Sequence, residues 1–197
     1  MTLFTRAAVG FGLLSAAIAA ETGPAKTYSE CQKKTSDPLD GCPDGTLFVS
    51  QDDSSAPFSV IQDAIRSLPN DTSPQVILIA EGTYVEQLNV TRPGPLTILG
   101  QSDDPWNGDL YSDVTYNTTR HNGVQIYQYK ANHQSSFPDN IHTSVLVVGP
   151  TYNATLVGAG PTGYPVAPDT PFGCSDFRAY NIDFRSTLNN FSLIKAR

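Results

Sequence analysis

Short apolar runs separated by polar turns follow one another along most of this chain, and each run has the length of a strand. Gly, Pro, Asn or Asp lie between most of the runs, as is typical of turns. The predicted strands cover residues 46–50, 76–80, 88–90, 96–99, 124–127, 145–148, 154–157 and 180–184. Two of them, VILIA at 76–80 and VLVV at 145–148, are apolar at every position, which is typical of parallel strands buried on both faces.

One segment instead has the spacing of an amphipathic helix. The apolar positions that define it are Phe58, Ile61, Ala64, Ile65 and Leu68. We expect Ser55 to cap this helix, Pro57 to lie in its first turn and Pro69 to end it. Residues 21–45 are polar and lack any such periodicity, so we interpret them as an N-terminal arm.

These elements favour an all-β architecture. No helical segment is predicted between the later strands, which argues against a doubly wound α/β fold and leaves a β-sandwich or a parallel β-helix. Several strand centres recur about 20 residues apart, near the lower end of the periods of solenoids. Two-residue Asn-Gly or Asp-Gly turns that are flanked on both sides by strands of alternating polarity are not evident. The pattern therefore favours the β-helix, with the single helix covering one end of its stacked core.

The first 20 residues have the pattern of a secretory signal peptide. Arg6 precedes an apolar run that ends in small residues at 17–19. The alternative is a membrane anchor, but the run is shorter than the roughly 20 residues that a span needs. Secretion is supported by N-glycosylation sequons, which predict glycans on Asn70, Asn89, Asn117, Asn153 and Asn190. The expected location is extracellular.

Composition and charge narrow the classes of partner. Hydrophobic residues make up 39% of the 197 residues, enough for a packed core in one domain or in part of a larger one. The formal net charge of −7 argues against binding to nucleic acid or to an anionic membrane surface. In an oxidising compartment, Cys31 and Cys42 could close a small disulfide loop. Cys174 is then free, bonded to another molecule, or without its partner.

Several motif matches carry no chemistry. The GxGxxG match at 158–163 contains and precedes prolines, so a phosphate-binding helix is not expected to open there. Residues 173–177 lack the second glycine of a serine-hydrolase turn, and the three histidines lack metal-ligand spacing. We interpret the acidic pairs at 52–53 and 103–104 as solvated turn residues, because two carboxylates do not make a cation site. No metal or cofactor is predicted.

A long polar stretch separates the predicted strands at 96–99 and 145–148. It holds or borders several aromatic residues, which are Trp106, Tyr111, Tyr127, Tyr129 and Phe137. Long loops are usually functional or disordered. Trp106 could therefore stack on a sugar ring, although local packing is the simpler interpretation.

Three consecutive segments and one later segment carry a specific resemblance. They are the helix FSVIQDAIRSLPND, the stretch QVILIAEGTYVEQLNV with a GxYxE motif, the strand GPLTILGQS, and DFRAYNIDFRS at 176–186. In order and spacing they resemble the pectinesterase (pectin methylesterase) family, notably its fungal members. The resemblance implies a right-handed, single-stranded parallel β-helix (pectin-lyase-like). Residues 46–197 would form its N-terminal part, with a capping helix, after a signal peptide at 1–20 and an arm at 21–45.

The GxYxE motif at 82–86 is interpreted as a turn between two coils, and a role in contacting the substrate is the alternative. Gly82 permits a positive φ angle, Tyr84 can bury its ring if its hydroxyl finds a partner, and Glu86 can accept backbone donors at the turn. The resemblance also implies that Thr151 contacts the substrate.

The chemistry that the resemblance implies rests on other residues. The family hydrolyses methyl esters of pectin with an aspartate nucleophile, an acid/base aspartate, an orienting arginine and glutamines that stabilise the oxyanion. These residues lie in QDT-like, DFxxG-like and GRPW-like segments, none of which occurs in this sequence. We therefore expect them beyond the C-terminal end.

The resulting expectation is a secreted pectinesterase that acts on methylated homogalacturonan. The chain as given would be truncated and inactive alone, and the full-length protein would be a monomer without a membrane span. Two alternatives remain open: a non-catalytic secreted polysaccharide-binding β-helix protein, and another β-helix carbohydrate enzyme such as a polysaccharide lyase.

Overall fold

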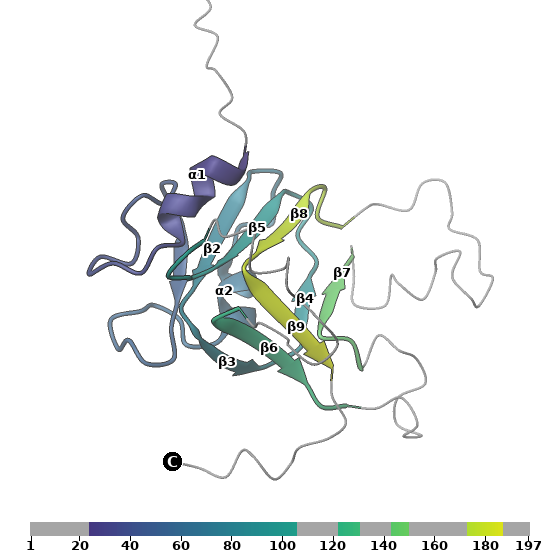
Figure 1. The fold of residues 1–197 in the computed structure, drawn as a ribbon. Coiled ribbons are helices and arrows are strands. Elements are labelled where there is room, and N and C mark those ends of the chain that lie inside the picture. Colours follow the sequence, from purple (N-terminus) through teal and green to yellow (C-terminus); the bar gives the residue numbers. More distant parts are fainter. Residues whose placement is uncertain (1–23, 106–121, 131–142, 150–172, 187–197) are drawn as a thin grey trace, which may run out of the picture.

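The computed structural model describes residues 24–105, 122–130, 143–149 and 173–186 (Figure 1). The predicted signal peptide, the strand predicted at 154–157 and Trp106 lie outside these residues. The helices are α1 (Pro24–Cys31) and α2 (Ile61–Ser67). The strands are β1 (Leu47–Val49), β2 (Gln75–Ile79), β3 (Gly82–Val85), β4 (Leu88–Val90), β5 (Leu96–Gly100), β6 (Val124–Gln128), β7 (Leu146–Val148), β8 (Phe177–Tyr180) and β9 (Ile182–Ser186).

Every strand pair in the described part of the chain is parallel, and the strands form three sheets. The first sheet has the order β1-β2-β5-β8, the second β3-β6-β9 and the third β4-β7. The chain visits the sheets in turn: β2, β3 and β4 are followed by β5, β6 and β7, and then by β8 and β9 (Figure 1). This topology is compatible with a parallel β-helix and differs from the antiparallel sheets of a β-sandwich.

Inward-facing side chains of the three sheets form the main hydrophobic core. Ile77 on β2, Ile98 on β5 and Ile126 on β6 are fully buried in it. Helix α2 adds Ile61 and Ile65 to the same core and packs against β1, β2 and β4. The prediction that this helix covers the core is therefore confirmed, and its apolar face is the one that the spacing indicated.

The first sheet is buried on its outer face as well. Leu78 on β2 and Leu99 on β5 point away from the main core, into a second apolar cluster that includes Phe48 and Cys31. Cys31, at the end of α1, forms a disulfide with Cys42. Burial on both faces explains why VILIA is apolar at every position, as predicted from the sequence.

The segment interpreted as an N-terminal arm, residues 21–45, contains helix α1, which the sequence pattern did not indicate. This helix has eight residues and contributes Tyr28 and Cys31 to the second apolar cluster. Two contacts are too few to produce a visible helical periodicity. An isolated helix of this length is marginal in water, so packing and the disulfide stabilise it rather than its own sequence pattern.

The predicted limits of α2 are partly wrong. The helix begins at Ile61, after an N-cap at Val60 that makes no side-chain capping bond, so neither Ser55 nor Pro57 lies in it. Phe58 instead bridges to β1, where its carbonyl accepts a hydrogen bond from the backbone N–H of Ser50 (2.9 Å). At the other end the prediction is confirmed, since the C-cap is Leu68, directly before proline.

Two local predictions about turns are also corrected. The segment at 82–85 is strand β3, not a turn, and the described glycines with positive φ are Gly41 and Gly45 rather than Gly82. The run predicted as one strand at 180–184 is divided between two sheets by Asn181, whose φ is 55°. Asn tolerates this left-handed conformation better than most residues.

Candidate functional site

Two side chains of the GxYxE motif, Tyr84 and Glu86, make contacts that hold structural elements together. The ring of Tyr84 is fully buried, and its hydroxyl donates a hydrogen bond to the carbonyl of Ala80 (2.9 Å). Burial, followed by the nearby carboxylates of Asp52 and Glu86, raises the pKa of Tyr84 to about 12. The phenol therefore stays neutral and serves as a buried anchor for the end of β2.

Glu86 accepts backbone donors, but from α2 rather than from its own turn. Its two carboxylate oxygens accept hydrogen bonds from the backbone N–H groups of Ile61 (3.0 Å) and Gln62 (2.9 Å). The side chain of Gln62 in turn bonds both backbone groups of Asn89 on β4 (2.6 and 3.2 Å). A carboxylate at a helix N-terminus is favourable, so Glu86 takes the capping role that Ser55 was expected to fill.

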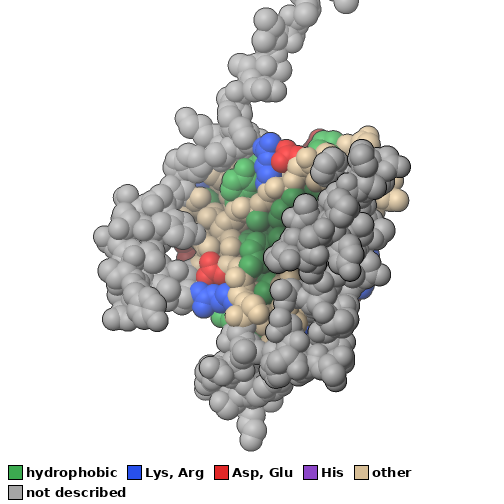
Figure 2. Space-filling model, turned by 90° about the vertical axis from the view of Figure 1, so that its right-hand side faces the viewer, with side chains coloured by type: hydrophobic (Ala, Val, Ile, Leu, Met, Phe, Trp, Pro, Cys, Tyr) green, Lys and Arg blue, Asp and Glu red, His purple; other side chains and the backbone are tan. Residues whose placement is uncertain are grey.

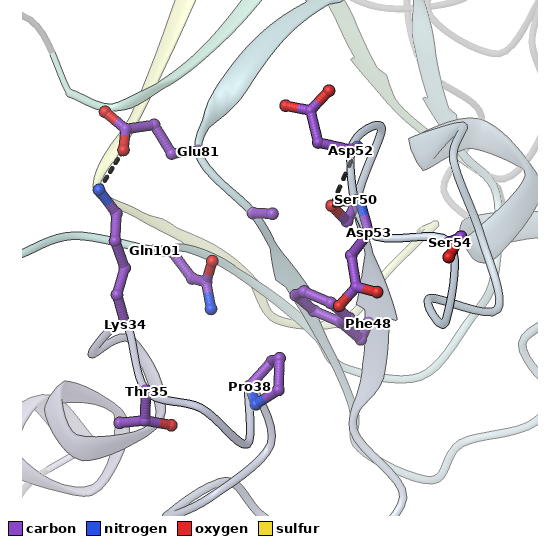
Figure 3. A pocket seen from close by; sticks show the side chains of 11 residues that line it. Lys34, Thr35, Pro38, Phe48, Ser50, Asp52, Asp53, Ser54, Glu81 and Gln101 are labelled. Carbon is purple, nitrogen blue, oxygen red and sulfur yellow. Dashed lines mark hydrogen bonds and ion pairs between the residues drawn. The ribbon is translucent and has the colours of Figure 1, made fainter.

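A polar cavity lies where the strands of the first sheet end. It has a volume of about 600 Å³, and Figure 3 shows its lining. Ser50 follows β1, Glu81 comes soon after β2, and Gln101 directly follows β5. Phe48 and Pro38 supply apolar surface to the same cavity. Parallel strands end at a common edge, which is why residues far apart in sequence meet here.

An ion pair divides this cavity from a smaller one of about 250 Å³. Lys34 pairs with Glu81 and also contacts Asp103 (3.2 Å). The hydrogen bond with Glu81 is the main cause that raises the pKa of Lys34 above its ordinary value. Lys34, Glu81 and Gln101 line both cavities, so the two spaces meet at this ion pair.

The acidic pairs that we interpreted as solvated turn residues lie around these cavities. Asp52 and Asp53 line the larger cavity, and Asp103 and Asp104 the smaller one. Asp53 accepts hydrogen bonds from the hydroxyl and the backbone N–H of Ser55, which lower the pKa of its carboxyl. They are solvated turn residues, as expected, but they also gather at one edge of the sheet. No metal-binding group of three or more Asp, Glu, His or Cys residues occurs in the described ranges.

Sequence reasoning missed Lys34, Glu81 and Gln101. The signal that could have found the last two is their position just after buried strands, because such residues meet at the carboxyl edge of a parallel sheet. No sequence pattern pointed to Lys34. Its segment is positioned by α1, and the sequence did not predict that helix.

A second group of polar and aromatic side chains lies on the outward faces of β6 and β9. Asp183 forms an ion pair with Arg185 (3.0 Å) and accepts a hydrogen bond from the amide of Asn122 (2.7 Å). The guanidinium of Arg185 lies 5.9 Å from the centre of the Tyr127 ring, which stacks on Tyr129. Partial burial is the main cause that raises the pKa of Tyr127. A cation beside stacked rings suits contact with a sugar chain.

Of the predicted glycosylation sites, two are described. Asn70 is exposed in the turn after α2, whereas Asn89 is half-buried in β4 with its side-chain oxygen enclosed. Thr151, Asn117, Asn153 and Asn190 lie outside the described residues. We predict higher glycan occupancy at Asn70 than at Asn89. Cys174 is a buried free thiol, and its sulfur lies 3.3 Å from the carbonyl oxygen of Gly94.

The geometry defines a strand-rich protein of stacked parallel sheets with a polar cavity at one sheet edge. Part of the chain is similar to fungal proteins named "Probable pectinesterase A". Identity is 36% over 94 residues for the Aspergillus niger protein, which is 47% of this chain and 26% of that relative. Identity is 33% over 93 residues for the Neosartorya fischeri and Aspergillus fumigatus proteins, again 47% of this chain and 25% of each relative.

These matches support a pectinesterase-like relationship for part of the chain. They span about a quarter of the length of the curated relatives. No protein-family model and no solved structure matches this chain. Across the ranges that the structure describes, no helix is long and apolar enough to cross a membrane.

Proposed function

We propose that this chain is the N-terminal part of a secreted pectinesterase, an enzyme that hydrolyses methyl esters of pectin. The observation that carries the proposal is the 36% identity over 94 residues to a probable pectinesterase A. Parallel sheets visited in turn by the chain are compatible with the family's right-handed, single-stranded β-helix. In this proposal the signal peptide directs secretion, and the domain begins near residue 46.

The described part of the chain would form and stabilise one end of the hydrophobic core of the catalytic domain. Glu86 and Gln62 fasten α2 over one end of the core, and Tyr84 anchors the first corner. Asp176 pairs with Arg178 (2.7 Å) and Asp183 with Arg185, but neither aspartate lies in a QDT-like or DFxxG-like segment. Since the sequence also lacks the QDT-like, DFxxG-like and GRPW-like segments, we expect no ester hydrolysis by these 197 residues alone.

A chimera tests this function directly. Residues 46–105 of this chain replace the aligned segment of the Aspergillus niger relative, and methanol release from methylated pectin is measured. A secreted, active chimera is expected, because the segment supplies the same helix and first strands of the core. The 197-residue chain alone, assayed in parallel, should remain at background. A chimera that is secreted and folded but inactive would contradict the proposal, as would steady turnover by the chain alone.

One observation favours a second function, the non-catalytic binding of a polysaccharide. Tyr127, Tyr129 and Arg185 form a stacked, cationic surface on the outward face of the second sheet. If binding is the function, affinity electrophoresis in pectin gels should retard the chain although no methanol is released. Tyr127→Ala should then remove most of the retardation, whereas Val85→Ala on the neighbouring strand should leave it unchanged.

A further inference from the structure

Gln101 has an unusual position for a polar side chain. The residue is only 7% exposed, yet its side-chain amide makes no hydrogen bond to any described residue. It lines both the 600 Å³ cavity and the 250 Å³ cavity, and Figure 3 shows its amide pointing into the space between Lys34 and Phe48. The enclosed side-chain polar atoms without a partner among the described residues are Asn89 Oδ1 and Arg92 Nε, so the Gln101 amide itself is reached from the cavity. A ligand in the cavity can therefore bond this amide directly.

The backbone around Gln101 is held firmly. Its N–H donates to the carbonyl of Ile79 on β2 (2.8 Å), which continues the ladder of the first sheet. On the other side, the amide of Gln32 donates to the carbonyl of Gly100 (3.0 Å), and the N–H of Ser102 donates to the carbonyl of Gln32 (2.9 Å). The side-chain amide is therefore presented from a fixed base, as recognition of a small ligand requires.

The walls of the larger cavity are suited to a ring that has one apolar face and polar edges. Phe48 and Pro38 supply apolar surface, while Asp52 and Asp53 supply carboxylate acceptors. Its volume falls within the range of about 300–1,000 Å³ that is common for small-molecule sites. Carboxylates and an amide together accept from and donate to neighbouring hydroxyl groups.

Charge restricts the ligand further. The two cavities are lined by the carboxylates of Asp52, Asp53, Glu81, Asp103 and Asp104, against the single ammonium of Lys34. Lys34 already contacts Glu81 and Asp103, so its charge is engaged. A polyanion entering here would meet like charges at short range and is disfavoured.

We propose that this cavity binds a neutral saccharide, with the amide of Gln101 hydrogen-bonded to two neighbouring sugar hydroxyls. This site goes beyond the proposed esterase function, since it includes no chemical step, and it is separate from the aromatic surface on β6 and β9. It is a place where an uncharged stretch of a sugar chain is held beside the carboxyl edge of the first sheet.

The test compares three trimers of similar size and different charge. Fluorescently labelled full chain, at nanomolar concentration, is titrated with fully methyl-esterified trigalacturonate, with de-esterified trigalacturonate and with the trimer of glucosamine. We expect the neutral trimer to bind best. The anionic trimer should bind at least about tenfold more weakly, and added salt should narrow that gap by screening the repulsion.

Gln101→Met keeps the volume of the side chain and removes its amide. Affinity for the neutral trimer should fall about tenfold, as expected for the loss of two hydrogen bonds. Gln128→Met is the matched control: Gln128 is also 7% exposed, but its side chain accepts a hydrogen bond from the N–H of Tyr129 and lies outside both cavities. The control should bind as the parent does but melt at a lower temperature, whereas Gln101→Met should melt no lower than the parent.

Any one of the following results would overturn the proposal: equal or tighter binding of the anionic trimer, binding of the neutral trimer that Gln101→Met leaves unchanged, or no binding of the neutral trimer by a folded chain. The proposal would also be overturned if the cationic trimer of glucosamine bound most tightly and Gln101→Met did not change its affinity. That result would show that the negative charge of the cavity alone attracts ligands. Methanol release is measured separately in the chimera, so an inactive chimera does not bear on this site, and an empty cavity does not bear on esterase activity.

Discussion

The early part of the described structure, residues 24–105, and the later strands β6 to β9 differ in how their apolar side chains are covered. In the early part, Ile77 and Ile98 are fully buried, with α2 over one end of the core. In the last strand, Ile182 and Phe184 are only half-buried, although their register partners on β6, Val124 and Ile126, are fully buried. An inward residue of a stacked sheet is thus covered completely only when a further layer lies over it.

The first and second sheets also differ in the side chains that cover their outer faces. The first sheet is covered outside by the cluster of Phe48, Leu78 and Leu99, which the Cys31–Cys42 disulfide borders. The second sheet has polar and aromatic residues outside instead. Figure 2 shows a band of hydrophobic side chains, beside charged groups, on the face that lies to the right in Figure 1. The early part is therefore covered by apolar side chains on both faces of its first sheet, whereas the later strands β6 and β9 carry polar and aromatic side chains on their outward faces.

The largest expected effect comes from the same substitution made in β6 and in β9. Ile126→Ala should destabilise the protein by about 3–5 kcal/mol, because a fully buried side chain leaves a cavity. Ile182→Ala should cost roughly 1–2 kcal/mol, since part of that side chain is already exposed. Urea unfolding followed by circular dichroism measures both values. Equal losses would show that the two strands are covered alike and would break the comparison.

The disulfide should contribute somewhat less. Reduction, or a Cys31→Ser, Cys42→Ser pair, is expected to lower stability by about 2–3 kcal/mol, because the bond closes a short loop in the unfolded chain. Mass mapping after alkylation should find Cys31 bonded to Cys42 and Cys174 alkylated only after unfolding. A bridge between Cys174 and either of the other two cysteines would refute this pairing.

The attachment of α2 can be tested at Glu86. Glu86→Ala should cost about 2 kcal/mol, because two backbone N–H groups at the start of the helix lose a charged acceptor. Glu81→Ala is the control, since an exposed ion pair of this kind contributes no more than about 1 kcal/mol. Hydrogen exchange should accelerate in α2 in the first variant alone. Similar effects in the two variants would mean that Glu86 does not hold the helix.

The smallest effect concerns alkaline pH. The folded-state pKa of Tyr84, about 12, lies above the ordinary value of 10.0, so the folded protein holds this proton more tightly than the unfolded chain. The stability it contributes is complete below pH 10 and is lost as the pH rises towards 12. Tyr84→Phe should lose about 1 kcal/mol at neutral pH, with the bond to Ala80, and should lose less further stability between these values. Melting temperatures at pH 8 and pH 11 measure the difference, and an identical decline in both proteins would contradict it.

Much of this fold could be predicted from the sequence because burial leaves a readable pattern. Strands β2, β5 and β6 were predicted to within one residue at each end, and β4 without error. The apolar face of α2 and the burial of Tyr84 followed from spacing and residue type. What failed was local: α1 has too few core contacts to show a period, and the corner at Asn181 lies inside an apolar run that otherwise resembles one strand.

The sequence by itself thus determined which segments become buried strands, since alternating and continuous apolar runs depend only on neighbouring residues. Only the tertiary structure decided which strands stack, and therefore which turns share an edge. Gln101 lies next to Lys34 and Asp52 because the ends of β1 and β5 flank the end of β2, and no local pattern encodes that order. The candidate site is a product of strand stacking, and the strands are a product of local hydrophobic pattern.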